Sequence, residues 1–128
     1  MSTTMKAGLG LGALASFLAA VVAALAVSVV AEAAPTKLVA TVGPGDTISL
    51  KTASGRRVSS LPRGAYAITV RDRSDEHNFA IRGSGVNKTV TSVEFVGTKT
   101  VTVRLGSGKT TFICVPHADD MRGTFTVK

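Results

Sequence analysis

Short alternating runs of apolar and polar residues fill the chain from Lys37 to its end. Val, Ile, Thr and Phe dominate these runs, and Gly, Pro, Ser and Asp interrupt them, which is typical of strands joined by turns. The alternation is clearest where Tyr66, Ile68 and Val70 share one predicted face of a strand. We therefore predict an all-β sandwich with strands over residues 38–42, 47–51, 66–71, 78–82, 101–105, 112–114 and 125–127.

The connecting segments differ in how clearly they can be assigned. Gly43-Pro44-Gly45-Asp46 is predicted to be a turn, and residues 53–63, with Gly55 and Pro62, a loop or a bent edge segment. Residues 86–97 show no clear period. Within them, Val93 and Phe95 are expected to cover the core.

The N-terminal stretch has a different composition. Residues 7–30 carry no charge and are rich in Ala, Leu and Val, and Ala31-Glu32-Ala33 supplies the small-x-small pattern of signal peptidase sites. We interpret residues 1–34 as an apolar signal helix, cleaved after Ala33 or Ala34. The alternative is an uncleaved membrane anchor, because the run exceeds the roughly 7–15 apolar residues of a signal peptide and reaches the ~20 that span a bilayer. Either way, the domain at residues 35–128 is exported: periplasmic, secreted, or held on the outer face of the cytoplasmic membrane.

Charge narrows the choice of partners. The formal net charge is +7, and cleavage of the leader would leave it unchanged because Lys6 and Glu32 leave together. A basic body favours acidic partners or surfaces. We exclude nucleic acid because the chain is exported and its basic residues are scattered, Arg56-Arg57 being the only adjacent pair. A chain of this length suits one small domain, which we expect to be a monomer.

The segment FICVPHADDMRGTF, residues 112–125, concentrates metal-ligating side chains. It contains Cys114, His117 and Met121, and His77 is the only other histidine in the chain. A thiolate, two imidazoles and a distant thioether form the ligand set of blue-copper electron-transfer sites. Singly, these residues could be a buried Cys, a gap-filling Met and hydrogen-bonded His residues. Metal ligation explains the set better, because an exported chain with one Cys cannot form an intramolecular disulfide and would expose a free thiol to oxidation.

From Tyr66 onward the sequence resembles the plastocyanin-like cupredoxins, the short exported bacterial blue-copper domains. The resemblance is carried by YAITVRDRSDEHNF, CVPHADDM and RGTFTV. It implies a cupredoxin-like Greek-key β-sandwich that binds one type 1 copper ion. It further implies that His77, Cys114 and His117 are the strong ligands and that Met121 is the weak axial ligand.

The same resemblance suggests roles for neighbouring residues. Asn78 would tie the two ligand loops together, its backbone amide lying near the thiolate, or else it is an ordinary residue at the start of a strand. Pro116 would stiffen the ligand loop through its fixed φ. His117 would be the partly exposed ligand through which electrons pass. The acids that flank the ligands would steer a partner with a basic face, or are simply solvated loop residues: Asp75, Glu76, Asp119 and Asp120.

Three functions are compatible with these residues. The first is a type 1 copper electron carrier that cycles between Cu(I) and Cu(II) among extracytoplasmic redox proteins, such as cytochromes and copper oxidases or reductases. The second is a copper-binding or copper-delivery protein without a redox circuit. The third is a metal-free β-sandwich interaction module, for which losing Cys114 would not matter. We do not expect an enzyme, because copper enzymes of related fold need further copper centres and no ligands remain here to build one.

Overall fold

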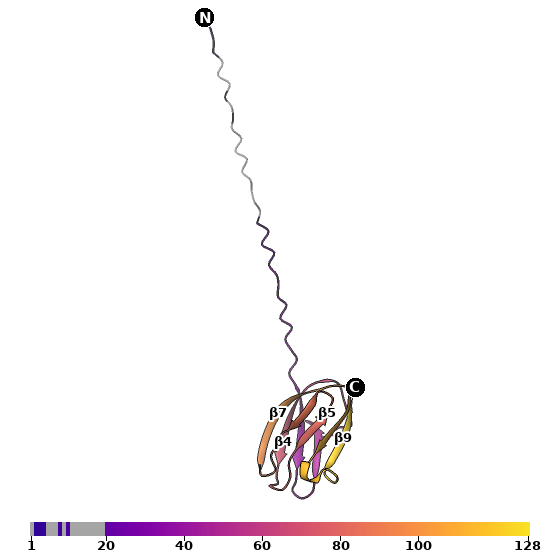
Figure 1. Cartoon of the computed structure of the whole chain (residues 1–128). Coiled ribbons are helices and arrows are strands. Elements are labelled where there is room, and N and C mark those ends of the chain that lie inside the picture. The colour runs from indigo at the N-terminus through magenta and orange to yellow at the C-terminus, as the bar shows by residue number, and fades with distance from the viewer. Residues whose placement is uncertain (1, 5–7, 9, 11–19) are drawn as a thin grey trace. The chain divides into compact units, whose positions relative to one another are not determined.

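The computed structural model describes residues 2–4, 8, 10 and 20–128. Residues Glu32–Lys128 form one compact unit, a sandwich of two β-sheets (Figure 1). The predicted all-β class is therefore confirmed. The strands are β1 (Thr36–Val42), β2 (Ile48–Thr52), β3 (Ser60–Leu61), β4 (Gly64–Asp72), β5 (Ala80–Gly83), β6 (Val86–Thr89), β7 (Gly97–Leu105), β8 (Gly108–Ile113) and β9 (Arg122–Val127), with one short 3₁₀ helix, η1 (Val115–His117).

The first sheet has the order β2-β1-β4-β7, and the second has the order β3-β9-β8-β5-β6. β1 runs parallel to β4, whereas β4 and β7 are antiparallel. The chain crosses repeatedly between the sheets, as expected for a Greek-key sandwich. These registers bring four loops to one end of the sandwich, which we call the metal end: residues 43–47, 73–79, 90–96 and 114–121.

The core lies between the two sheets and draws on both. Tyr66, Ile68 and Val70 of β4 are all buried, as the alternation predicted. From the second sheet, the ring of Phe112 stacks on that of Phe79, with centroids 6.0 Å apart. Among the residues that the structure describes, all the buried apolar side chains lie between residues 38 and 127, and they form the core of the sandwich.

The prediction for residues 86–97 was wrong in detail. Val93 and Phe95 are only half-buried, and the core contacts from this region come from Val86 and Val90. Val86 belongs to β6, which pairs with β5, and the Val90 amide donates to the Phe79 carbonyl at 2.8 Å. This pairing turns Val86 and Val90 inward. The strand expected from residue 78 begins at Ala80, and the one expected from 101 begins at Gly97.

A close approach at Gly123 fixes how β8 and β9 pack near the metal end. A Cβ built on Gly123 would lie 2.1 Å from Cζ of Phe112, well inside van der Waals contact. The Phe112 ring therefore rests directly on the β9 backbone. Only glycine allows this aromatic side chain to occupy that place.

The predicted N-terminal helix is not shown by the described residues. Residues 20–35 contain no helix, and residues 11–19 of the apolar run lie outside the described part of the chain. Across the described residues, no helix has the length and apolar character needed to cross a bilayer. The signal peptide, its cleavage site and the alternative of an anchor stay predictions.

Candidate metal centre

Two segments supply the candidate ligands. Cys114 directly follows β8, and η1 then carries Pro116 in its first turn and ends at His117. His77 lies on the loop between β4 and β5. Backbone hydrogen bonds hold the 114–121 loop: the Met121 amide donates to the His117 carbonyl at 2.8 Å, and the Cys114 amide donates to the Met121 carbonyl at 3.0 Å.

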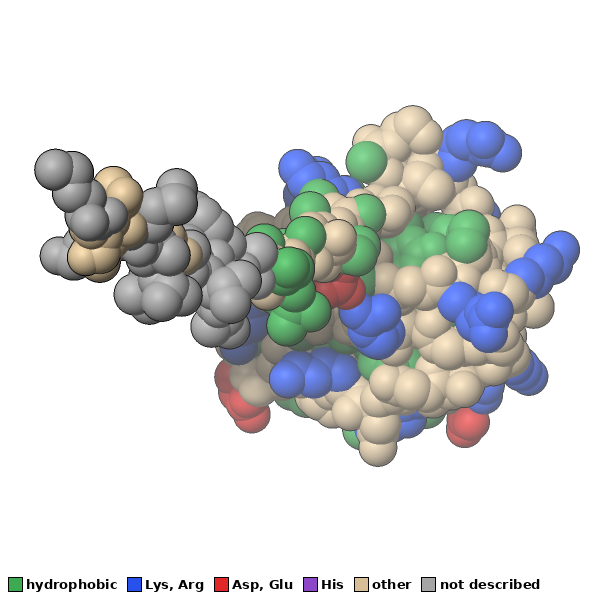
Figure 2. All heavy atoms as spheres, turned by 90° about the horizontal axis from the view of Figure 1, so that it is seen from above, with side chains coloured by type: hydrophobic (Ala, Val, Ile, Leu, Met, Phe, Trp, Pro, Cys, Tyr) green, Lys and Arg blue, Asp and Glu red, His purple; other side chains and the backbone are tan. Residues whose placement is uncertain are grey.

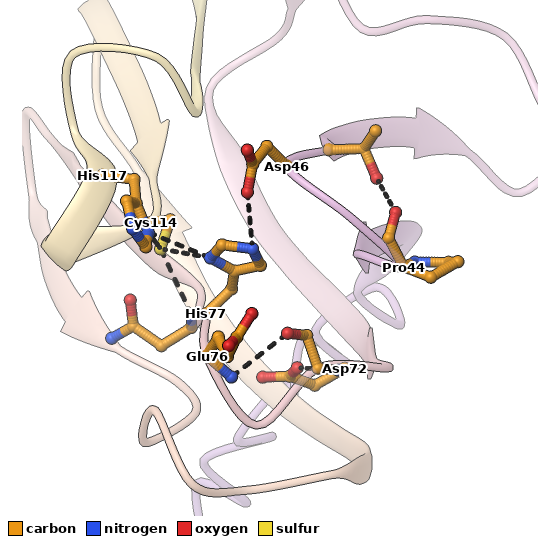
Figure 3. Close-up of polar contacts among 10 residues, drawn as sticks. Pro44, Asp46, Asp72, Glu76, His77, Cys114 and His117 are labelled. Carbon is orange, nitrogen blue, oxygen red and sulfur yellow. Dashed lines mark hydrogen bonds and ion pairs between the residues drawn. The ribbon is translucent and has the colours of Figure 1, made fainter.

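The imidazoles of His77 and His117 and the thiol of Cys114 converge on one point (Figure 3). The two Nδ1 atoms are 3.0 Å apart, and the Cys114 Sγ lies 3.7 Å from His77 Nδ1 and 3.6 Å from His117 Nδ1. A point equidistant from the three atoms is about 2.0 Å from each, close to metal–imidazole and metal–thiolate bonds of about 2.0–2.3 Å. This donor set, one thiolate and two imidazoles in a small cluster, fits copper.

Burial differs sharply among the three ligands. His77 is 2% exposed and Cys114 0%, whereas His117 is exposed. Since Nδ1 of His117 faces the cluster, its other ring nitrogen is left on the solvent side. His77, Cys114 and His117 are thus positioned to bind one copper ion, with a single ligand at the surface.

Met121 lies in the core beside this cluster. It is 1% exposed, and its backbone is bonded to both Cys114 and His117. The Met121 side chain is therefore shielded from water. It belongs to the 114–121 loop, which also carries Cys114 and His117. Axial ligation by its sulfur stays a prediction.

Asn78 makes the two contacts expected of it. Its backbone amide points at the Cys114 Sγ at 3.5 Å, and its side-chain Oδ1 accepts a hydrogen bond from the Val115 amide at 2.7 Å. The first contact places a partial positive charge next to the thiolate. The second joins the His77 loop to the Cys114–His117 loop. Both favour a rigid cluster because hydrogen bonds around the ligands restrict their movement.

Asp46 is a contact that the sequence did not predict. Its carboxylate lies 3.1 Å from Nε2 of His77, on the side of the ring opposite Cys114 and His117 (Figure 3). A hydrogen bond there holds the proton on Nε2 and leaves Nδ1 free as a ligand. Gly43-Pro44-Gly45-Asp46 was predicted only as a turn, because its nearness to His77 depends on the parallel pairing of β1 with β4.

The four acids predicted to flank the ligands are all exposed at the metal end. Asp75 and Glu76 lie on the His77 loop, and Asp119 and Asp120 lie between His117 and Met121. Beside His117, Val115 and Pro116 are also exposed. The surface around the exposed ligand thus combines a small apolar area with acidic loops.

The two-sheet sandwich and its cluster define a cupredoxin fold with a His-Cys-His group like that of a type 1 copper site. The chain is similar to solved structures of one such protein, rusticyanin. A structure of rusticyanin from Thiobacillus ferrooxidans is 20% identical, with 76% of this chain and 79% of that chain covered and a TM-score of 0.53. Reduced rusticyanin is 18% identical, with 77% and 82% covered and a TM-score of 0.52. No protein-family model and no curated protein matches the sequence.

Proposed function

We propose that this protein is a single-copper electron carrier working outside the cytoplasm. The observation that carries the proposal is the convergence of His77, Cys114 and His117 from two loops, with only His117 exposed. Bound copper would supply a one-electron couple between Cu(I) and Cu(II). A site of this kind transfers electrons quickly when its ligands move little between the two states, and the protein supplies that rigidity.

Each residue has a separate part in this proposal. Cys114 provides the soft ligand, kept from water and from oxidants by complete burial. His77 is held on one side by the Asp46 carboxylate and presents Nδ1 on the other. Asn78 connects the loops and donates toward the thiolate. Met121 is the proposed weak axial ligand.

Electrons would enter and leave through His117. Its ring is the exposed ligand, and Val115 and Pro116 beside it offer apolar contact to a partner. Partners would be extracytoplasmic redox proteins of the cytochrome or copper oxidase and reductase kind. The exposed acids of the metal end would steer partners that carry a basic docking face.

The steering role can be tested with Asp119→Asn combined with Asp120→Asn. We expect slower association with a basic redox partner at low salt and a smaller difference at high salt, because screening removes long-range attraction. If the association rate and its salt dependence do not change, these acids are simply solvated loop residues with no role in steering a partner.

Export by residues 1–34 is part of the same proposal. Residues 1–34 would direct the chain out of the cytoplasm, because the uncharged apolar run at 7–30 and the following Ala31-Glu32-Ala33 match an export signal. N-terminal sequencing of protein from the producing cell distinguishes the two fates of the leader: a chain that begins at Ala34 or Pro35, or an intact chain in the membrane fraction.

Copper delivery is the second candidate, since an exposed ligand also gives a copper acceptor access to the cluster. Repeated reduction and reoxidation of the loaded protein in the presence of a Cu(I) chelator separates the two functions. An electron carrier retains its copper and regains its full Cu(II) spectrum in each cycle. Transfer of copper to the chelator on the first reduction would instead favour delivery.

A further inference from the structure

The acidic residues of the sandwich are gathered at one of its two ends. The chain has 8 Asp and Glu residues, and all except Glu32 lie at the metal end. One is in the 43–47 turn, three are at the end of β4 and on the loop that follows, one precedes β7, and two lie in the 114–121 loop: Asp46, Asp72, Asp75, Glu76, Glu94, Asp119 and Asp120. The opposite end therefore has almost no negative charge.

That opposite end carries exposed bases, and we call it the basic end. The strand registers bring their positions together: Gly64 pairs with Leu105, Gly108 pairs with Val127, and the Arg63 amide donates to the Lys128 carbonyl. Figure 2 looks onto this end and shows Lys and Arg side chains spread over it with few acids among them. The basic end is defined by Lys37, Arg63, Arg104, Lys109 and Lys128, all exposed.

A hollow between two of these arginines makes the basic end more than a scatter of charges. Arg63 and Arg104 line an open depression of about 560 Å³, together with Leu105 and the glycines at positions 64, 85 and 106. Two arginines that line one open hollow suit a phosphate, because arginine binds phosphate oxygens in a bidentate manner. Arg104 is the one base here with an acidic partner, Glu32.

We propose that the basic end docks on anionic phospholipid headgroups, with the metal end facing away from the bilayer. Charge complementarity supports the contact, since each Lys or Arg close to an anionic leaflet adds attraction over about a Debye length. Two features support the orientation. β1 begins toward the basic end, so the apolar N-terminal run joins the sandwich there, and the acidic metal end is repelled by the same lipids.

This docking does not require the leader to be retained or copper to be bound. Cleavage after Ala33 or Ala34 would remove Glu32 and so release Arg104 from its only acidic partner. Before cleavage, the apolar leader would hold the domain at the membrane covalently. After cleavage, the basic end would bind anionic lipids reversibly and in a salt-sensitive way. The His117 surface would stay open to redox partners in both forms.

The test is co-sedimentation of residues 35–128, which contain the whole core, with vesicles of phosphatidylcholine alone or mixed with phosphatidylglycerol. We expect binding to the anionic vesicles only, weakened by salt. Arg63→Gln with Arg104→Gln should reduce partitioning about 25-fold, at about fivefold per charge. Arg71→Gln with Arg73→Gln, at the metal end of β4, removes the same charge and should change it less than about twofold.

A second variant, Lys37→Gln with Lys128→Gln, tests the same surface in case the Arg63/Arg104 variant does not fold. It should also bind anionic vesicles more weakly than the unmodified domain. Its circular dichroism spectrum should not change. Orientation is read from diethylpyrocarbonate modification of the exposed His117, which vesicle binding should not slow. No binding to anionic vesicles, equal losses in the basic-end and Arg71/Arg73 variants, or protection of His117 by vesicles would overturn the proposal. If the domain binds polyglutamate but not vesicles, the basic end binds an acidic protein rather than a membrane.

Discussion

Asn78→Ala should destabilise the metal-free sandwich by about 2 kcal/mol. The side chain is 4% exposed, and its Oδ1 accepts from the part-buried Val115 amide at 2.7 Å. Truncation leaves that amide without its acceptor, which costs about 1–3 kcal/mol for a buried group. For a domain of this size, about 2 kcal/mol corresponds to a fall in the melting temperature of roughly 8–16 °C.

Thermal unfolding of residues 35–128 without copper, followed by circular dichroism, measures this effect independently of metal binding. Asn87→Ala is the matched control, because Asn87 is exposed and its Oδ1 accepts only from the Arg82 guanidinium at 3.2 Å. We expect the control to change stability by less than about 0.5 kcal/mol. Equal and small effects in the two variants would refute the role of Asn78 in joining the ligand loops.

Three further predictions concern other contacts. Asp46→Asn should weaken Cu(II) binding about 10-fold in a chelator competition, because the carboxylate no longer orients His77; an unchanged affinity would show that the contact is incidental. Gly123→Ala should lower the free energy of unfolding by about 1–3 kcal/mol, since its Cβ would overlap the Phe112 ring, whereas Thr124→Ala, at an exposed position, should not. Burial raises the pKa of Tyr66, so its protonated form stabilises the fold below the unfolded pKa of about 10, and this contribution is lost as pH rises through the higher folded pKa. Tyr66→Phe should therefore flatten the alkaline loss of stability in denaturant titrations, and an unchanged alkaline slope would contradict this.

The strong candidate ligands could be predicted because the chain offers few alternatives. With one Cys and two His residues, any His-Cys-His site must use Cys114, His77 and His117. Asp46 could not be found in this way. Its turn looks like any glycine-rich turn, and its place beside His77 follows from the register in which Val42 pairs with Asp72. Such a long-range pairing leaves no local signal in the sequence.

The same distinction holds for the strands. β4 could be predicted from the sequence because its alternating apolar residues all face the core. The first residues of β7, Gly97 to Thr100, are exposed or half-buried, so no apolar period marks them, and only their pairing with residues 69–72 of β4 makes them a strand. Val86 and Val90 likewise enter the core through the pairing of β6 with β5 and a bond to Phe79. An apolar residue in a polar context does not show which way it turns.

The measurement that tests the copper site most directly is the visible absorption and EPR spectrum of residues 35–128 after addition of Cu(II), beside the Cys114→Ala variant. We predict an intense thiolate-to-copper band near roughly 600 nm with small hyperfine splitting, absent from the variant. A weak spectrum typical of tetragonal Cu(II), the same spectrum from both chains, or no binding at all would contradict the type 1 assignment.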